Sequence, residues 1–243
     1  MDFRDHLDAL RRDTAGLLAA ARDAPPSAPV PACPGWTTID LTYHIGEVHH
    51  FWATIVADRV ADPDTVVVPP RPADDADVVA FAEASGRRLQ HVLAATDPAT
   101  PVWTWSTQKD VAFVARRMAQ ETAVHRYDAE RTAGREHRID PALASDGVDE
   151  FLFHFLPHVS PVAAPLDGSV HLHCTDVDGE WLVTTDADGA DVVTREHAKG
   201  DAAIRGPAHH LLLVLWRRQP LDTVDVIGDR AVAERLVART NLE

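Results

Sequence analysis

Cysteine is scarce in this chain of 243 residues, which contains only Cys33 and Cys174. Two cysteines are too few for a disulfide framework or a four-sulfur zinc site. Cys33 lies in a proline-rich stretch and has no basic neighbour in the sequence, so we expect it to pack or face solvent and not to act as a catalytic thiol. A metal bound to this chain must therefore be held by His, Asp and Glu side chains.

Positive charge is also in short supply. The chain has 23 Lys and Arg residues against 38 Asp and Glu residues, which gives a formal net charge of −15. Such an acidic chain offers no general phosphate-binding surface unless its cations are strongly segregated. We therefore expect no nucleic-acid partner.

Long hydrophobic runs are missing from the sequence. The longest fully apolar run is LLLVLW, residues 211–216, whereas a membrane span needs about 20 residues. The opening MDFRDHLDAL also lacks the basic-then-apolar pattern of a signal peptide. Because 45% of the residues are hydrophobic, the chain can still bury a sizeable core. We expect a globular cytoplasmic protein with no membrane partner.

The first half of the sequence shows the apolar periodicity of helices, interrupted by segments rich in Pro, Asp and Thr. Thr37 and Asp40 form a capping-box pattern at the start of the second helix, and Gly134 suits the C′ position of the fourth. The expected helices cover about residues 3–23, 37–60, 75–96 and 110–134. Four helices of about this length predict a four-helix bundle.

The second half begins with a helix and then changes character. After Asp140-Pro141, a cap followed by a first-turn proline, we expect a fifth helix that reaches Leu156. Alternating and β-branched segments follow, with Asp-Gly turn signals at 178–179 and 188–189. The expected strands are SVHLHCTD, EWLVTTD, DVVTREH, DAAIRG and DTVDVIG, and the expected helices are PAHHLLLVLWRR and residues 229–239.

This change of pattern predicts two domains. We expect a four-helix bundle over residues 1–139 and a small α+β domain with an antiparallel sheet over residues 140–243.

Glu121 and His125 lie four residues apart on the expected fourth helix and therefore point the same way. They continue an apolar stripe that includes Val114 and Met118, so we expect them in the bundle core. Burying an unpaired carboxylate costs several kcal/mol, so Glu121 needs a cation, a hydrogen-bond donor or a raised pKa. A bound metal would satisfy it, although a Glu and His pair at this spacing is also common in helices that bind no metal.

His44 is the natural third ligand, because it lies on an otherwise apolar stripe of the second helix with Leu41, Val48 and Phe51. Two imidazoles and one carboxylate from facing bundle helices suit a catalytic Zn²⁺ ion with a position left for water or substrate. The same three ligands could hold Fe²⁺, Ni²⁺ or Mn²⁺, because the order of affinities alone does not select zinc.

The other histidines, and Asp128, are not expected to be ligands of this metal. His49 and His50 point away from His44 around the helix, so we expect them to be solvated or at the domain interface. His171 and His173 alternate on one strand face and could bind a metal, but such a pair is usually an exposed polar face. Asp128 could accept a hydrogen bond from a ligand imidazole or pair with an arginine.

The segments CPGWTTIDLTYHIGEVHHFW, residues 33–52, and RRMAQETAVHRYDAE, residues 116–130, resemble the two signature segments of the mycothiol-dependent maleylpyruvate isomerase family. That family belongs to the wider group of DinB-like metal-binding four-helix bundles. LHCTDVDGEWLV and IRGPAHHLLLVLWRRQPL are similar to its C-terminal sterol-carrier-like α+β domain, so the resemblance covers nearly the whole chain. The composition rich in Ala, Asp, Arg and Val also suits an actinobacterial source, where mycothiol is made.

The resemblance implies that His44, Glu121 and His125 match the family's metal ligands and that the metal, a zinc ion in the family, receives the thiol of mycothiol. Coordination by Zn²⁺ deprotonates a thiol that would otherwise be only a few per cent ionised at neutral pH. In the implied isomerisation, the thiolate adds to the double bond of maleylpyruvate, the bond rotates, and elimination returns the thiol. The same site could transfer the thiol to another small electrophile.

Arg218 in LWRRQPL best matches the family's catalytic arginine, which would clamp substrate carboxylates with its planar fork. Arg217 stands where the family usually has a small residue, and a charged final turn of a helix is the alternative role for Arg218. Two other functions stay open from the residues alone. One is a hydrolase in which the metal activates water, and the other is a non-enzymatic ligand-binding protein with a metal-stabilised bundle.

Overall fold

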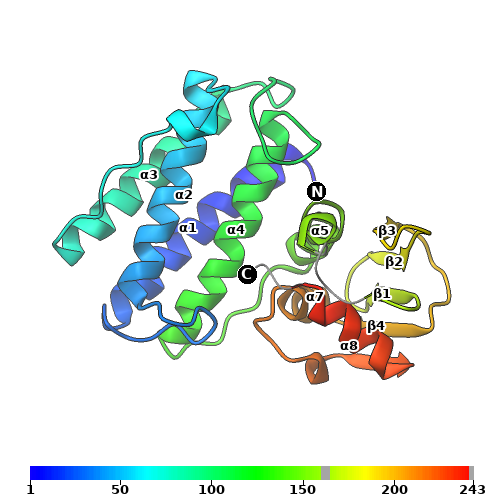
Figure 1. Ribbon diagram of the computed structural model, residues 1–243. Coiled ribbons are helices and arrows are strands. Elements are labelled where there is room, and N and C mark those ends of the chain that lie inside the picture. Colours follow the sequence, from blue (N-terminus) through cyan, green and yellow to red (C-terminus); the bar gives the residue numbers. More distant parts are fainter. Residues whose placement is uncertain (160–164, 241–243) are drawn as a thin grey trace. The chain divides into compact units, whose positions relative to one another are not determined.

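The computed structural model describes residues 1–159 and 165–240. The chain divides into two compact units, Met1–Arg138 and Ile139–Glu243. Figure 1 shows helices alone in the N-terminal unit, and a sheet with helices in the C-terminal unit.

Four long helices form the N-terminal unit, as the apolar periodicity predicts. Their bounds are Phe3–Asp23 for α1, Thr38–Asp58 for α2, Asp75–Ala95 for α3 and Val111–Thr132 for α4, with a short 3-10 turn, Pro63–Thr65, before α3. The most extensive packing joins α1 to α4 and α2 to α3. The predicted four-helix bundle is confirmed.

The capping signals mark the helix ends. The Thr37 backbone N–H donates to Asp40 Oδ2 at 2.8 Å, which is one half of the predicted capping box at the start of α2. After α4, Gly134 has a φ of 72°, a left-handed conformation that glycine adopts without a steric cost. These local devices explain why α2 and α4 begin and end where they do.

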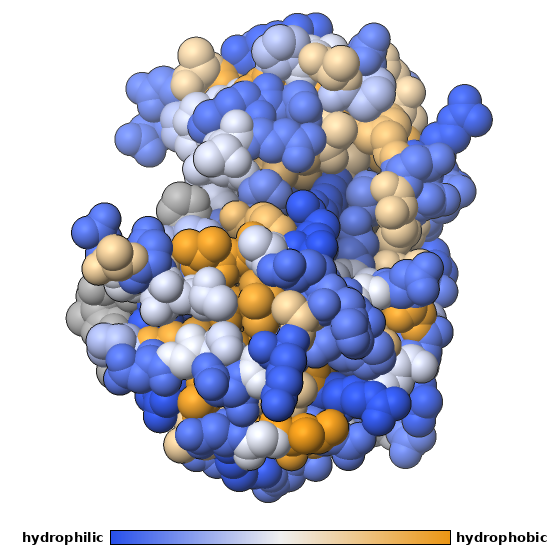
Figure 2. Space-filling view, turned by 90° about the vertical axis from the view of Figure 1, so that its right-hand side faces the viewer, coloured by the Kyte–Doolittle hydropathy of each residue, from blue (hydrophilic) through white to orange (hydrophobic). Residues whose placement is uncertain are grey.

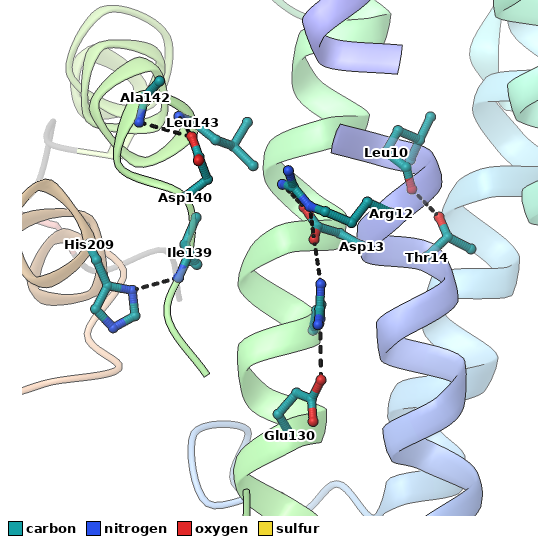
Figure 3. Close-up of polar contacts among 11 residues, drawn as sticks. Leu10, Arg12, Asp13, Thr14, Glu130, Ile139, Asp140, Ala142, Leu143 and His209 are labelled. Carbon is teal, nitrogen blue, oxygen red and sulfur yellow. Dashed lines mark hydrogen bonds and ion pairs between the residues drawn. The ribbon is translucent and has the colours of Figure 1, made fainter. Parts of the chain in front are cut away.

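An ion-pair chain joins α1 to α4 (Figure 3). Asp13 is 2% exposed and accepts hydrogen bonds from Arg12 of its own helix and, at 2.9 Å, from Nη1 of Arg126 on α4. Arg126 also lies 3.3 Å from Glu130. The side chain of Arg126 passes directly over Gly16, where an added Cβ would lie 2.2 Å from its Nε. Gly16 is therefore the residue that lets this arginine reach Asp13.

The C-terminal unit begins with α5, Pro141–Glu150, which Asp140 caps through bonds from the backbone N–H groups of Ala142 and Leu143 (Figure 3). The helix continues as a π-helical turn, Phe151–Phe155, and then as α6, Leu156–Val159. The predicted fifth helix is thus interrupted by a π turn. The other helices are α7, Ala208–Leu215, and α8, Arg230–Ala238, with a 3-10 turn at Leu221–Thr223.

Five strands form one sheet in the order β3-β2-β1-β4-β5. Their bounds are Val170–Cys174 for β1, Glu180–Thr185 for β2, Asp191–Thr194 for β3, Ala202–Gly206 for β4 and Asp225–Gly228 for β5. Neighbouring strands β1 and β2, β2 and β3, and β4 and β5 pair antiparallel. The predicted α+β class is confirmed.

One pairing departs from the expected antiparallel sheet, because β4 runs parallel to β1. The Asp-Gly turns set the direction of the β1-β2-β3 meander only, whereas β4 reaches β1 through residues 195–201, which cross back over the length of a strand. β3 also ends earlier than DVVTREH predicts. Arg195 leaves the ladder to bind Asp149 of α5 in two hydrogen bonds, of 2.5 and 2.8 Å.

The hydropathy of the helices and of the surface agrees with the charged composition and short apolar runs of the sequence. No helix in residues 1–159 and 165–240 is long and apolar enough to cross a membrane. On the face in Figure 2, hydrophilic residues predominate and hydrophobic residues form small patches between them. Among the described residues, the exposed large hydrophobic side chains are Met1, Val67, Val192 and Ile227.

Candidate metal centre

His44 from α2 and Glu121 and His125 from α4 meet in the bundle. One potential ligand atom of each lies within 4.8 Å of the other two. Nε2 of His44 is 3.2 Å and Nε2 of His125 is 3.3 Å from the same oxygen, Oε1 of Glu121. The structure thus brings together the three residues that the sequence proposed as metal ligands.

The other oxygen of Glu121 has a different partner. Nη2 of Arg117, one turn earlier on α4, donates to Oε2 at 2.9 Å. Arg117 is 3% exposed, and the sequence had not indicated a role for it. Its hydrogen bond fixes the carboxylate so that Oε1 faces the two imidazoles.

The second ring nitrogen of His125, Nδ1, is hydrogen-bonded to Asp128. Nδ1 of His125 is 3.0 Å from Oδ2 of Asp128, which is 1% exposed. This is the first of the two roles that the sequence left open for Asp128. When the imidazole is neutral, a carboxylate on Nδ1 favours the tautomer whose Nε2, the nitrogen that faces Glu121, carries the lone pair needed to bind a metal.

Cys33 also lies at this site. Its Sγ is 3.8 Å from Oδ2 of Asp128, and Cys33, His125 and Asp128 can present ligand atoms within 4.8 Å of one another. The side chain packs against the hydrophobic core, as expected, but it has a basic neighbour that the local sequence does not reveal. His125 lies 92 positions further along the chain, so only the fold brings the two together.

Electrostatics couple Glu121 and His125. Burial opposes the ionisation of Glu121, but the charge of His125, hydrogen bonds from His125 and His44, and the charge of Arg117 hold its pKa well below the usual value. Burial likewise opposes protonation of His125, but the Glu121 charge and the hydrogen bond to Asp128 raise its pKa well above the usual value. In the absence of a metal, the two groups therefore form an ion pair.

Trp36, in the loop before α2, lies against both imidazoles. Its ring centroid is 4.8 Å from that of His44 and 6.4 Å from that of His125, and the second pair is stacked at 18°. A ring in this position restricts the rotation of both histidines. The sequence indicated Trp36 only as part of the segment before α2.

The buried face of α2 matches the predicted stripe only in part, because Leu41 is buried as expected but the histidine inside the bundle is not the predicted one. His49 is 0% exposed and its Nε2 is 2.9 Å from Oγ1 of Thr122, so it is neither solvated nor at a domain interface. Val48 is only half-buried and the His44 side chain is 28% exposed. Ile45 and His49 are fully buried, and His49 lies between Thr122 of α4 and Gly86 of α3, whereas His44 lies at the edge of this buried face.

The remaining histidines and Arg218 lie in the C-terminal unit. His171 and His173 are on β1, and His171 is only 8% exposed, which does not fit an ordinary exposed polar face. Arg218 follows α7, where Arg217 adopts a left-handed φ of 58°. Nη1 of Arg218 donates to the Trp216 carbonyl at 2.9 Å.

The donor set of the bundle fits a divalent cation. A tetrahedral zinc ion with bonds of about 2.1 Å separates its ligand atoms by about 3.4 Å, close to the 3.2 and 3.3 Å observed between the Nε2 atoms and Oε1. The side chains of His44 and Glu121 are 28% and 19% exposed, so the centre is not fully enclosed by the protein. Nitrogen and oxygen donors of this kind suit Zn²⁺, Fe²⁺, Ni²⁺ or Mn²⁺.

A four-helix bundle that gathers two imidazoles and a carboxylate, followed by an α+β unit, defines the class of this protein. The mycothiol maleylpyruvate isomerase N-terminal domain matches residues 7–130, and the MDMPI C-terminal domain matches residues 142–235. The chain belongs to the mycothiol maleylpyruvate isomerase family.

Solved structures agree with this assignment. The chain is similar to the crystal structures of the mycothiol-dependent maleylpyruvate isomerase and of a histidine-to-alanine mutant of it, with TM-scores of 0.62 and 0.61. In both comparisons the identity is 11%, and 93% of this chain and 93% of the other are covered. No curated protein matches the chain significantly. At this identity, the structural likeness establishes the fold alone.

Proposed function

We propose that this chain is a metal-dependent enzyme that uses mycothiol to isomerise maleylpyruvate or a closely related unsaturated acid. The observation that carries the proposal is the meeting of His44, Glu121 and His125 in a bundle of this family. His44 Nε2, His125 Nε2 and Glu121 Oε1 would hold the metal, with zinc as the favoured ion. A bound cation of this kind supplies positive charge that lowers the pKa of a thiol and so favours the thiolate at neutral pH.

The protein's own residues prepare this centre. Arg117 keeps Oε2 of Glu121 occupied, and Asp128 keeps Nδ1 of His125 occupied, so that one oxygen and one nitrogen stay directed at the same point. Trp36 covers the two imidazoles and limits their motion. Rigid positioning of this kind reduces the reorganisation needed when reactants bind.

The proposed reaction leaves the thiol unchanged overall. The mycothiol thiolate adds to one carbon of the conjugated double bond, and the electron pair moves onto the adjoining carbonyl oxygen. The former double bond, now single, rotates. The electron pair then returns, the carbon–sulfur bond breaks and the trans product leaves with the thiolate restored.

Arg218 is the proposed partner of the substrate carboxylates. Its guanidinium donates to the Trp216 carbonyl through Nη1, and its N–H groups lie in a planar fork. Such a fork matches a carboxylate in a bidentate way, which the single ammonium of lysine does not.

Metal content, mycothiol binding and maleylpyruvate turnover, measured on the same samples, test the proposal. We expect Glu121→Ala to lose the metal, to lose mycothiol binding and to reduce turnover by at least about 100-fold, since even changes behind a ligand cost 10 to 100-fold. Glu136→Ala, which removes an exposed carboxylate of the same unit, is the matched control and should behave like wild type. Arg218→Lys should keep metal and thiol binding but raise KM for the substrate.

The fate of the thiol separates the proposed isomerase from its rivals. An isomerase leaves the mycothiol concentration constant, whereas an S-transferase consumes one thiol per electrophile. Turnover without any thiol would indicate a hydrolase that activates water. Full metal and mycothiol binding by Glu121→Ala would overturn the proposal.

A further inference from the structure

A second cluster of potential metal ligands is formed by residues of the C-terminal unit and shares none with the bundle centre. His171, His173, Glu180 and His197 each offer a ligand atom, and these atoms all lie within 4.8 Å of one another. Nothing in the proposed reaction uses this cluster.

The carboxylate of Glu180 is at its centre. Its Oε1 is 2.8 Å from Nδ1 of His173, and its Oε2 is 3.3 Å from Nε2 of His171 and 2.5 Å from Nδ1 of His197. The ring centroids of His171 and His197 are 5.4 Å apart and their planes are nearly perpendicular, at 86°. Three imidazoles therefore converge on one carboxylate from different directions.

Sheet register and topology explain how these four residues, from two strands and a later connecting segment, meet. His173 is the direct antiparallel partner of Glu180, and His171 is two residues back on the same strand face. The other face of β1 carries Val170 and Leu172, which are buried in the core of the unit. His197 comes from residues 195–201, the segment that must cross back from β3 to β4.

Charge around the cluster favours a cation. A hollow of about 390 Å³ beside His173 and His197 is lined by the acidic residues Asp178 and Glu196 in addition to Glu180. Arg195 also lines it, but its guanidinium is bound to Asp149. Arg205, the β4 neighbour of His173, lies opposite Asp225 in the register of β5.

We propose that the C-terminal unit binds a divalent transition-metal ion, best represented by Zn²⁺, through His171, His173, Glu180 and His197. Three imidazoles and one carboxylate are the nitrogen and oxygen donors that zinc accepts in four-coordinate sites, where ligand atoms lie about 3.4 Å apart. The hard cations Ca²⁺ and Mg²⁺ prefer sets made only of oxygen donors. The imidazoles thus select against them.

Four protein ligands fill a tetrahedral ion, so this site is structural and not catalytic. The ion links β1, β2 and the crossing segment, and it fixes His197, whose side chain is 82% exposed. Its bound form stabilises the folded unit by mass action.

Zinc content of the full-length chain tests this site. Protein stripped by a chelator is given excess Zn²⁺ and desalted, and bound zinc per chain is measured together with the affinity by titration calorimetry. With both the bundle centre and this site intact, we expect two zinc ions per wild-type chain. His197→Ala and Glu180→Gln should each keep one, with zinc affinity at the C-terminal site weakened at least about tenfold.

Control variants separate zinc bound at the C-terminal site from zinc bound at the bundle centre. Glu121→Ala should keep the C-terminal ion and lose the other, and His91→Ala, which removes an exposed imidazole of neither cluster, should bind like wild type. Because the His197 side chain is largely exposed, its removal leaves the packed core intact. If His197→Ala and Glu180→Gln both bind as much zinc as wild type, the site does not exist, whatever the bundle binds.

Discussion

At the scale of single residues, the two carboxylate oxygens of Glu121 have different roles, one structural and one directed at the proposed metal. Oε2 is bound by the buried Arg117, while Oε1 faces His44 and His125. Asp128 plays the corresponding role for His125. A ligand whose remaining polar atom is hydrogen-bonded to a neighbouring residue keeps its orientation. Such supporting hydrogen bonds therefore affect metal affinity almost as strongly as the ligands do.

His49 is a buried histidine with a different role. Burial lowers its pKa to about 4, although the nearby charge of Glu121 works in the opposite direction. The folded pKa thus lies below the unfolded value of about 6.5. Below pH 6.5 the unfolded chain binds a proton that the buried His49 does not. The free energy of unfolding is therefore fully present above pH 6.5 and falls as the pH drops from 6.5 towards 4.

We predict that His49→Gln flattens the loss of stability in acid. Gln can keep a hydrogen bond to Oγ1 of Thr122 but does not titrate. Between pH 7 and pH 5 the wild type should lose about 2 kcal/mol more free energy of unfolding than the variant. Urea unfolding at both pH values measures this, and the exposed His91→Gln is the control. Equal losses in wild type and His49→Gln would show that His49 does not titrate as inferred.

At the scale of elements, α1 and α4 are joined by a buried charge network that needs a small residue. Arg126 reaches Asp13 across Gly16, and both Asp13 and Glu130 are buried. A glycine within a helix normally costs about 1 kcal/mol relative to alanine. Its presence in α1 is explained by the passage of the arginine side chain.

Gly16→Ala is therefore expected to destabilise the bundle by about 1–3 kcal/mol, because displacing Arg126 weakens a buried ion pair by more than alanine gains in helix propensity. In an Arg126→Met background, the same Gly16→Ala change should instead stabilise the protein. Chemical unfolding of the four proteins gives the coupling energy. Additive effects of the two substitutions would contradict this explanation.

At the scale of the whole molecule, the chain forms two compact units that meet in sequence at Arg138 and Ile139. Residues 134–136, just before this point, are exposed. Exposed connections between units tolerate insertion and cleavage better than packed elements do.

We propose that residues 1–139 and 140–243 fold separately, and we predict that a specific protease site inserted after Glu136 can be cut without loss of either fold. Circular dichroism should be unchanged after cleavage, and two fragments of the expected sizes should stay folded. The same insertion after Ala123, buried in α4, should unfold the protein and serves as the control. Aggregation of either fragment on cleavage would argue against separate folding.

Much of this protein follows from the sequence by itself. Apolar periodicity and caps determined α1 to α4, because a helix depends on residues three and four apart. The same short spacing placed Glu121 and His125 on one face of α4. Asp-Gly turns likewise determined the β1-β2-β3 meander, since a hairpin is set by the residues of its turn.

Only the tertiary structure decided which side chains from distant elements meet. It made His49 the buried histidine of α2, because that choice depends on which helices pack against α2. It brought Cys33 beside His125, and it carried His197 over β1 to join Glu180. The parallel pairing of β4 with β1 has the same origin. These contacts depend on long-range packing and on the path of connecting segments, and no local spacing in the sequence encodes either.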